Sequence, residues 1–183
     1  MSEYTLDVQL ITEVARAFAT ATGLGCVADD VSGADTLCAV GPVCADCRLC
    51  DSLGRDAQAC GRSHLYGLAE AERFGGRYIY FCQRGLTFFP SPLVGWRTSE
   101  AKLTVGPFRM VSCEDFAAYE LEERLKLSPH QIRELLPLVE AVPFVEPERV
   151  TQLSVLLFMS AGFINNASAV ARMREQEAAD LLQ

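Results

Sequence analysis

Five of the chain's eight cysteines lie close together in the sequence, and their thiols could bind a metal or undergo redox chemistry. They are Cys44, Cys47, Cys50, Cys60 and Cys82. The first three are spaced at intervals of three residues, and His64 follows Cys60 by four. Residues four apart share one face of a helix, so the thiol and the imidazole could reach the same ion. Zinc is commonly held by thiolates and imidazoles, and iron–sulfur clusters are held mainly by thiolates.

We therefore expect a metal site whose ligands come from Cys47, Cys50, Cys60, Cys82 and His64, with Cys44 as a further candidate. Zinc would form a closed tetrahedral site that stabilises the fold, whereas an iron–sulfur cluster would use thiolates. The spacing does not choose between them. Two alternatives stay open. A pair of thiols could form a reversible disulfide, so that the cluster itself receives a redox signal, or the cysteines could be small buried core residues.

Composition and charge argue against several classes of protein. Half of the 183 residues are hydrophobic, which is enough for a packed core. The net charge of −8 and the scattered arginines argue against direct nucleic-acid contact. The acidic N-terminal residues do not resemble a signal peptide, and the longest apolar run, 153–164, is short and contains serines. We expect a cytoplasmic protein without a membrane span, in which thiols stay reduced.

Hydrophobic periodicity and turn residues predict the secondary structure. The pattern predicts helices over residues 4–21 and 56–73, and strands over 26–28, 36–40, 77–83, 86–94 and 102–105. Because Pro90 and Pro92 interrupt one strand, we expect it to be an edge strand or a bulged one. From Cys113 the pattern is helical, and the last helix starts at Glu148.

Strands and helices do not alternate regularly along the chain, which favours an α+β fold over a doubly wound one. We predict an antiparallel sheet flanked by helices in a first domain at residues 1–115. Residues 116–183 would form a C-terminal helical extension that includes a linker helix. The final helix has an apolar stripe that includes Val150, Leu157 and Val170. Such a stripe can pack on its own domain or on a second copy, and we expect a homodimer through it.

Several short motifs carry a resemblance to a known family. They are Cys47-Arg48-Leu49, Gly54-Arg55 with Cys60, the aromatic stretch from Gly76 through Cys82 to Gly85-Leu86, and Ser91-Pro92-Leu93. Together they resemble the PocR sensory domain, a PAS-like module of bacterial transcription regulators and signalling proteins. The resemblance covers roughly residues 10–115. It implies a small organic ligand held between sheet and helices, and a regulatory output outside this chain.

The resemblance also implies where a ligand would bind. In a PAS-like cavity, inward-facing side chains of the later strands would line the site, and we expect Tyr80, Arg84, Phe89 and Phe108 to contact the ligand. The family's ligands are small hydrocarbon derivatives such as diols. Here Gln83 and Phe88 replace a histidine and an acid of the family pattern, which argues against a diol. With two histidines and no phosphate-binding loop, we do not expect an enzyme.

Overall fold

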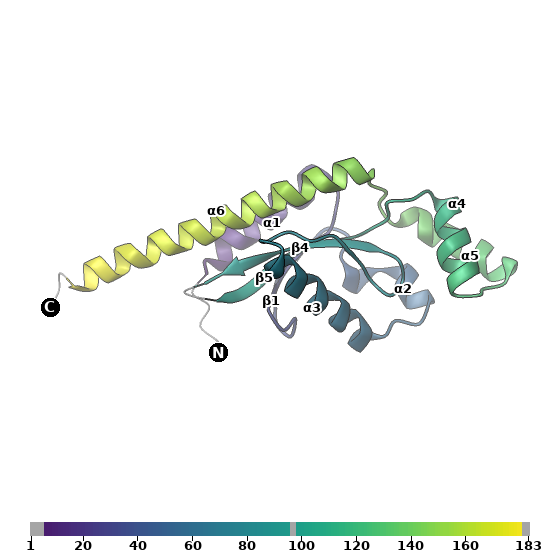
Figure 1. Cartoon of the computed structure of the whole chain (residues 1–183), viewed down its shortest axis with the longest axis horizontal. Helices are drawn as coiled ribbons and strands as arrows, with labels where there is room; N and C mark the ends of the chain where they lie inside the picture. Colours follow the sequence, from purple (N-terminus) through teal and green to yellow (C-terminus); the bar gives the residue numbers. More distant parts are fainter. Residues whose placement is uncertain (1–5, 96–97, 181–183) are drawn as a thin grey trace.

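The computed structural model describes residues 6–95 and 98–180. It shows a five-stranded antiparallel sheet in the order β2-β1-β5-β4-β3. The strands are β1 (Cys26–Asp30), β2 (Thr36–Val40), β3 (Tyr80–Phe81), β4 (Thr87–Val94) and β5 (Ser99–Phe108). Helices pack on both faces of this sheet (Figure 1). The predicted α+β, PAS-like architecture is confirmed.

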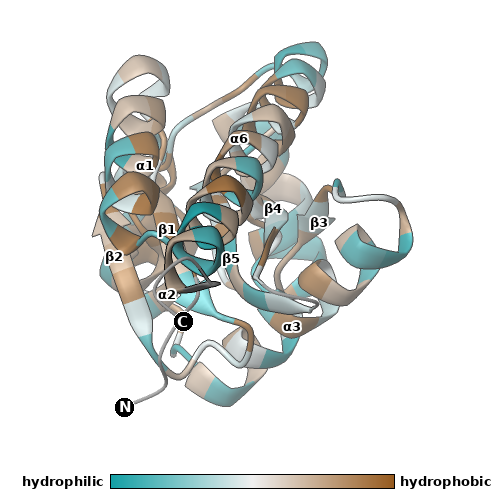
Figure 2. Ribbon diagram, turned by 90° about the vertical axis from the view of Figure 1, so that its left-hand side faces the viewer, coloured by the Kyte–Doolittle hydropathy of each residue, from teal (hydrophilic) through white to brown (hydrophobic). Residues whose placement is uncertain are grey.

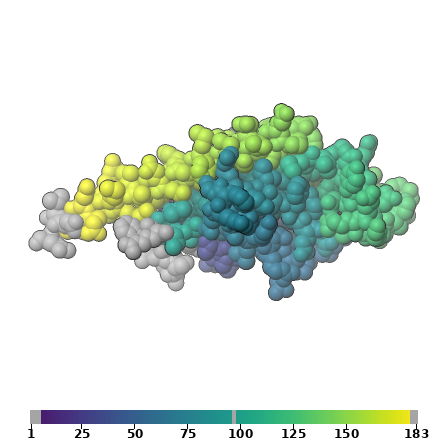
Figure 3. All heavy atoms as spheres, in the orientation of Figure 1, coloured from purple at the N-terminus to yellow at the C-terminus, as the bar shows by residue number. Residues whose placement is uncertain are grey.

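The helices form two groups and an end lobe. They are α1 (Val8–Thr22), α2 (Arg48–Ser52), α3 (Ala57–Arg73), α4 (Cys113–Phe116), α5 (Pro129–Ala141) and α6 (Pro147–Asp180), with a 3-10 turn η1 (Cys44–Asp46) and a π-helical stretch η2 (Ala117–Arg124). Helices α1 and α6 cover one face of the sheet, while α2 and α3 lie on the other (Figure 1). The lobe of α4, η2 and α5 forms one end of an elongated molecule, and the last turns of α6 form the other (Figure 3).

Strand alternation separates the two faces of the sheet. On β5, Leu103 and Val105 belong to the core beneath α1 and α6. Lys102 and Thr104, on the same strand, project to the face covered by α3 and are also buried. A second core joins Phe88 and Tyr80 to α2 and the end lobe. The sheet is therefore buried on both sides, and its α3 side carries polar groups among the apolar ones.

Several predicted boundaries differ from the structure. Strand β4 is bulged, with register shifts near both ends, and it lies between β5 and the very short β3 rather than at the edge. The strand predicted over 77–83 is reduced to Tyr80–Phe81. The helix predicted after Cys113 changes into a π-helical stretch at Ala117. Residues 4 and 5 of the first predicted helix lie outside the described residues.

Helix α6 is long enough both to pack on the sheet and to extend beyond it. Its 34 residues correspond to about 50 Å at 1.5 Å per residue. It continues unbroken through Asn165, whose side-chain oxygen accepts a hydrogen bond from the Val94 backbone N–H at 2.9 Å. By length and composition alone it could cross a membrane, a criterion that core helices of soluble proteins also meet. Its first half packs on the sheet, and its last turns extend beyond it (Figure 1).

Candidate functional site

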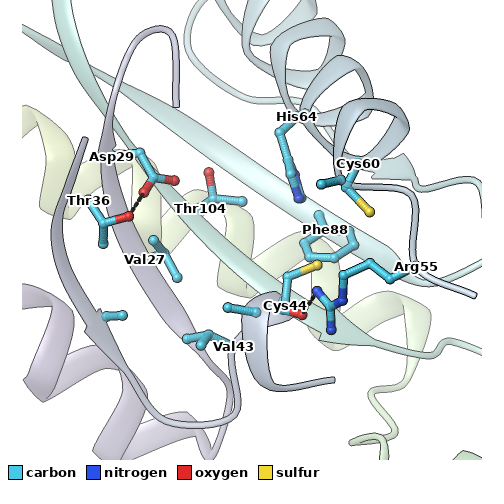
Figure 4. Close-up of a pocket in the computed structure, with 15 residues that line it drawn as sticks. Val27, Asp29, Thr36, Val43, Cys44, Arg55, Cys60, His64, Phe88 and Thr104 are labelled. Carbon is cyan, nitrogen blue, oxygen red and sulfur yellow. Dashed lines mark hydrogen bonds between the residues drawn. The ribbon is translucent and has the colours of Figure 1, made fainter. Parts of the chain in front are cut away.

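A cavity of about 320 Å³ lies between the sheet, η1 and α3. Val27 and Asp29 of β1, Thr36 of β2 and Thr104 of β5 form the sheet side of its wall, and Cys44 and His64 are among the residues on the helix side (Figure 4). The volume is at the lower end of the range for small-molecule sites. The space therefore suits a compact ligand of a few non-hydrogen atoms.

Local sequence features position both walls. A tight turn joins β1 to β2, where the Asp30 carboxylate accepts a hydrogen bond from the Asp35 N–H at 3.1 Å. Asp56 caps the start of α3 by accepting from the Ala59 N–H at 3.0 Å. Gly25 brings the chain leading into η1 close to β1, because a Cβ there would lie 2.1 Å from the Pro42 carbonyl oxygen. These contacts fix the spacing between sheet and helix that leaves the cavity open.

One end of the cavity is polar. The Thr36 hydroxyl donates to the Asp29 carboxylate at 2.9 Å. Burial raises the pKa of Asp29, opposed by this hydrogen bond and by the nearby charge of Lys102. The Thr104 side chain is 6 % exposed, and its hydroxyl has no hydrogen-bond partner among the described residues. Buried hydroxyls are normally paired, so Thr104 offers an unused donor and acceptor to whatever fills the cavity.

His64 forms the opposite wall and is held neutral. Its Nδ1 shares a hydrogen bond of 2.5 Å with the Tyr80 hydroxyl, and its ring stands edge-on to Phe88, with centroids 4.8 Å apart. Burial, assisted by the charge of Lys102, lowers the pKa of His64 to about 4. Gly67 allows α3 to approach this closely, because a Cβ there would lie 2.3 Å from the Tyr80 ring.

The thiols gather beside the cavity, around the loop that Arg55 holds in place. The Arg55 guanidinium pairs with Asp51 at 2.7 Å and donates to the carbonyl oxygens of Cys44 and Cys47 at 2.6 and 3.1 Å. All of its nitrogens are thereby engaged within the protein. Cys44 and Cys60 both line the cavity, so the thiol cluster and the candidate ligand site share a wall.

The thiols influence one another's ionisation. A hydrogen bond from the Cys50 thiol, with backbone N–H groups of Cys50 and Leu49, lowers the pKa of Cys47 to about 6, against the effect of burial. The same hydrogen bond raises the pKa of Cys50. Burial, together with the neighbouring Cys60 and Cys82, raises the pKa of Cys44 to about 12. This arrangement favours ionisation of Cys47 over that of Cys50 and Cys44.

The structure brings the predicted metal ligands into one region without arranging them around one point. Cys47, Cys50 and Cys82 join the core on the α3 side of the sheet, and all eight cysteines are free thiols. Within the described residues, no three Cys, His, Asp or Glu side chains form a group that could hold a metal ion. The His64 Nδ1 is engaged by Tyr80. The metal site therefore stays a prediction.

The four residues expected to contact a ligand lie outside the cavity wall. Phe89 and Phe108 face the other side of the sheet, in the core under α1 and α6. Tyr80 stands behind His64, and Arg84 donates to the Gly54 carbonyl oxygen at 2.8 Å. Adjacent phenylalanines face opposite ways on a strand, and the bulge in β4 makes Phe88 the inward one. The role of the four in ligand binding is untested.

Sequence reasoning missed the polar wall of Asp29, Thr36 and Thr104. A signal for one of them was present in β5, where Lys102 and Thr104 alternate with apolar residues. Polar residues that alternate along a strand usually face solvent. Here they face α3 instead and are buried, which requires a polar partner or a ligand.

A comparison with known families decides the assignment. Residues 5–169 match the family described as the sensory domain found in PocR. The chain belongs to the PocR sensory-domain family. Searches of curated proteins and of solved structures find no match. As a PocR sensory domain the chain has a signal-sensing role, and sensory domains of this type are generally not enzymes.

Proposed function

We propose that this PocR sensory domain binds a small organic molecule in the cavity between β1, β5 and α3. It would serve as the sensing part of a cytoplasmic bacterial transcription regulator or signalling protein. The observation that carries the proposal is Thr104, a residue of the cavity wall whose buried hydroxyl has no hydrogen-bond partner among the described residues. A buried hydroxyl without a partner costs about 1–3 kcal/mol, which a ligand can offset by hydrogen bonding to it.

The wall defines the chemistry of the ligand. Val27 and Phe88 offer apolar surface, while Thr104 and Asp29 offer hydrogen-bonding groups at the polar end. Arg55 also lines the cavity, but Asp51 pairs with its charge and three of its five N–H groups are already engaged, so it attracts an anionic ligand only weakly. The site therefore favours a neutral or cationic molecule with a compact apolar body and at least one donor, such as an alcohol or an amine.

The test compares two valine substitutions. A panel of small alcohols, diols, amines and carboxylates is screened by thermal shift, and the best ligand is titrated calorimetrically. Thr104→Val should raise its dissociation constant about tenfold, the effect of losing one hydrogen bond of about 1.4 kcal/mol. Thr87→Val is the matched control, because its hydroxyl is equally buried and unpartnered but lies outside the cavity wall. Equal affinities for the two variants would contradict the proposal.

A second candidate is that the thiol cluster receives the signal. The gathering of five thiols beside the cavity favours it, because soft ligands suit zinc or iron–sulfur clusters. Without a metal, a peroxide could oxidise the hydrogen-bonded pair of Cys47 and Cys50. The two thiols would then lose two protons and two electrons to form a disulfide, and the peroxide O–O bond would break to give two molecules of water or alcohol.

Metal content and a visible spectrum, measured on protein purified without oxygen, separate these possibilities. Stoichiometric zinc, or iron with broad violet absorption, would support a metal centre, and its loss in Cys47→Ser and Cys82→Ser would locate it. The control is Cys26→Ser, because Cys26 is buried in the core on the other face of the sheet. Metal-free protein whose thiols are unchanged by peroxide would contradict the second candidate and leave the ligand proposal intact.

A further inference from the structure

Helix α6 is apolar on two faces, and the described residues cover only one of them. Leu153, Leu157, Ala161 and Ile164 enter the core beneath the helix. Asn165 contacts the end of β4 by accepting the hydrogen bond from the Val94 N–H. These contacts account for one side of the helix. Figure 2 shows further hydrophobic segments along α6.

The uncovered side has a regular pattern, which we call the outer stripe. Its members are Leu156, Met159, Phe163, Asn166, Val170 and Met173. The intervals are three, four, three, four and three, which is the a/d pattern of a coiled coil continued over nearly three heptads. The five apolar members are 40 to 64 % exposed. An exposed apolar stripe of this length normally marks an interface.

The position of the stripe leaves room for a partner. With about 100° of rotation per residue, the centre of the outer stripe points about 180° away from the side that contacts the sheet. The sheet therefore lies on the opposite side of α6 from the outer stripe. A second helix can approach the stripe without meeting the sheet. The last turns of α6 extend beyond the sheet (Figure 1).

The flanks of the stripe are narrow. Around the middle of the stripe, the positions beside it are Ser160, Gly162, Ala167 and Ala169, where coiled coils normally carry long charged residues. A Cβ at Gly162 would meet nothing within 4 Å, so no contact with the described residues explains the glycine. Small flanking residues let two helix backbones come close together, which suits a helix–helix contact.

We propose that the outer stripe is the docking surface for a second copy of this chain, and that two α6 helices pack there in parallel as a two-stranded coiled coil. In a parallel pair, each member of the stripe faces its own counterpart. The two Asn166 amides then meet on the axis and hydrogen-bond to each other. In the antiparallel pairing that best overlaps the stripe, Asn166 would lie against Phe163 and lose that partner. A buried asparagine therefore selects the parallel register.

A lipid bilayer is a different occupant for an apolar helix face. Helix α6 passes the length and composition criterion for a membrane span. However, its other face is held in the core through Leu157 and Ile164, which are fully buried. Insertion would have to pull these side chains out of the domain. A second copy covers the outer stripe and leaves the core intact.

The first test measures mass in solution. Sedimentation equilibrium of the whole chain should show a reversible dimer. The double variant Met159→Glu/Phe163→Glu should raise the dissociation constant at least tenfold while circular dichroism and thermal unfolding stay unchanged. The control is Leu65→Glu, because Leu65 is 43 % exposed on α3, far from the stripe. A monomer at all concentrations, a dimer that persists in the double variant, or binding of the whole chain to phosphatidylcholine and phosphatidylglycerol vesicles without dimerisation would each overturn the proposal.

The second test measures the register. Asn166→Cys should form a disulfide-linked dimer under mild oxidation, because parallel pairing brings the two sulfurs together on the axis. The matched control is Glu175→Cys, which is exposed on the same helix but on the side away from the stripe. The unsubstituted chain is oxidised in the same way, and any cross-linking through its native cysteines is subtracted. Cross-linking of Glu175→Cys as fast as Asn166→Cys would overturn the parallel register.

Discussion

His64 is the residue whose protonation should most directly make the stability of the fold depend on pH. It is enclosed by Tyr80, Phe88 and α3, and its folded pKa of about 4 lies below the ordinary value of 6.5. The unfolded chain therefore binds a proton between these pH values that the folded chain does not bind. The stability contributed by a neutral His64 is complete above pH 6.5 and is lost as the pH falls towards 4.

We predict that the free energy of unfolding falls by roughly 2 kcal/mol from pH 7.5 to pH 4.5 on account of His64 alone. This value is smaller than the full shift implies, because the side chain is only partly buried. His64→Gln can keep a hydrogen bond to Tyr80 but cannot titrate. Urea unfolding of both proteins at several pH values gives the difference. If the two curves stay parallel across this range, the predicted burial of a neutral imidazole is wrong.

At the scale of single residues, the sequence predicted the important residue types more accurately than it predicted their positions. The thiols of Cys44, Cys47 and Cys60 were recognisable from spacing, and the structure brings them beside the cavity. Thr104 and Asp29 were not recognised, because a polar residue on a strand has the same appearance whether it faces water or a cavity. Only the position of α3 over the sheet distinguishes the two cases.

The contact between α3 and the sheet depends on how closely the helix can approach. At Gly67 a methyl group would lie 2.3 Å from the Tyr80 ring, whereas at Gly61, on the same helix, it would meet nothing within 4 Å. We predict that Gly67→Ala lowers the free energy of unfolding by about 1–3 kcal/mol, the range for overpacked cores. Gly61→Ala should raise it by up to about 1 kcal/mol, because alanine favours helix.

Chemical denaturation measures whether the free energy of unfolding changes in opposite directions in the two variants. The substitutions are identical and lie on one helix, so helix propensity contributes equally to both. A stabilised Gly67→Ala would mean that α3 lies farther from Tyr80 than the structure shows. In that case the His64–Tyr80 hydrogen bond, and with it the wall of the cavity, would also need revision.

Whole elements were predicted well where local signals were strong. The helix predicted over residues 56–73 is α3, and Asp56 caps its start by accepting a hydrogen bond from the Ala59 N–H. Strand β3 is shorter than predicted because only two of its residues find partners on β4. The two stripes of α6 were merged into one, since the sequence does not say which apolar positions meet the sheet.

At the scale of the whole molecule, the question is whether residues 1–115 fold without the rest. The sequence predicted a boundary there, and the family match runs across it to residue 169. In the structure, Val150, Leu153, Leu157 and Ile164 complete the core that begins with α1 and the sheet. At about 1.5–3 kcal/mol each, their burial amounts to roughly 6–12 kcal/mol. That equals most of the stability of a typical domain, about 5–15 kcal/mol.

We therefore predict that a fragment of residues 1–115 does not unfold cooperatively, because the part of the sheet that α6 covers would be exposed to water. A fragment of residues 1–170 keeps every described buried residue, including Ser168, and should retain a cooperative transition. Near-ultraviolet circular dichroism during thermal unfolding distinguishes the two outcomes. Cooperative unfolding of the shorter fragment would support the predicted boundary and make α6 a separable linker. Its absence would make α6 part of the sensory domain, so that movement of the sheet on ligand binding is transmitted directly to the helix that carries the outer stripe.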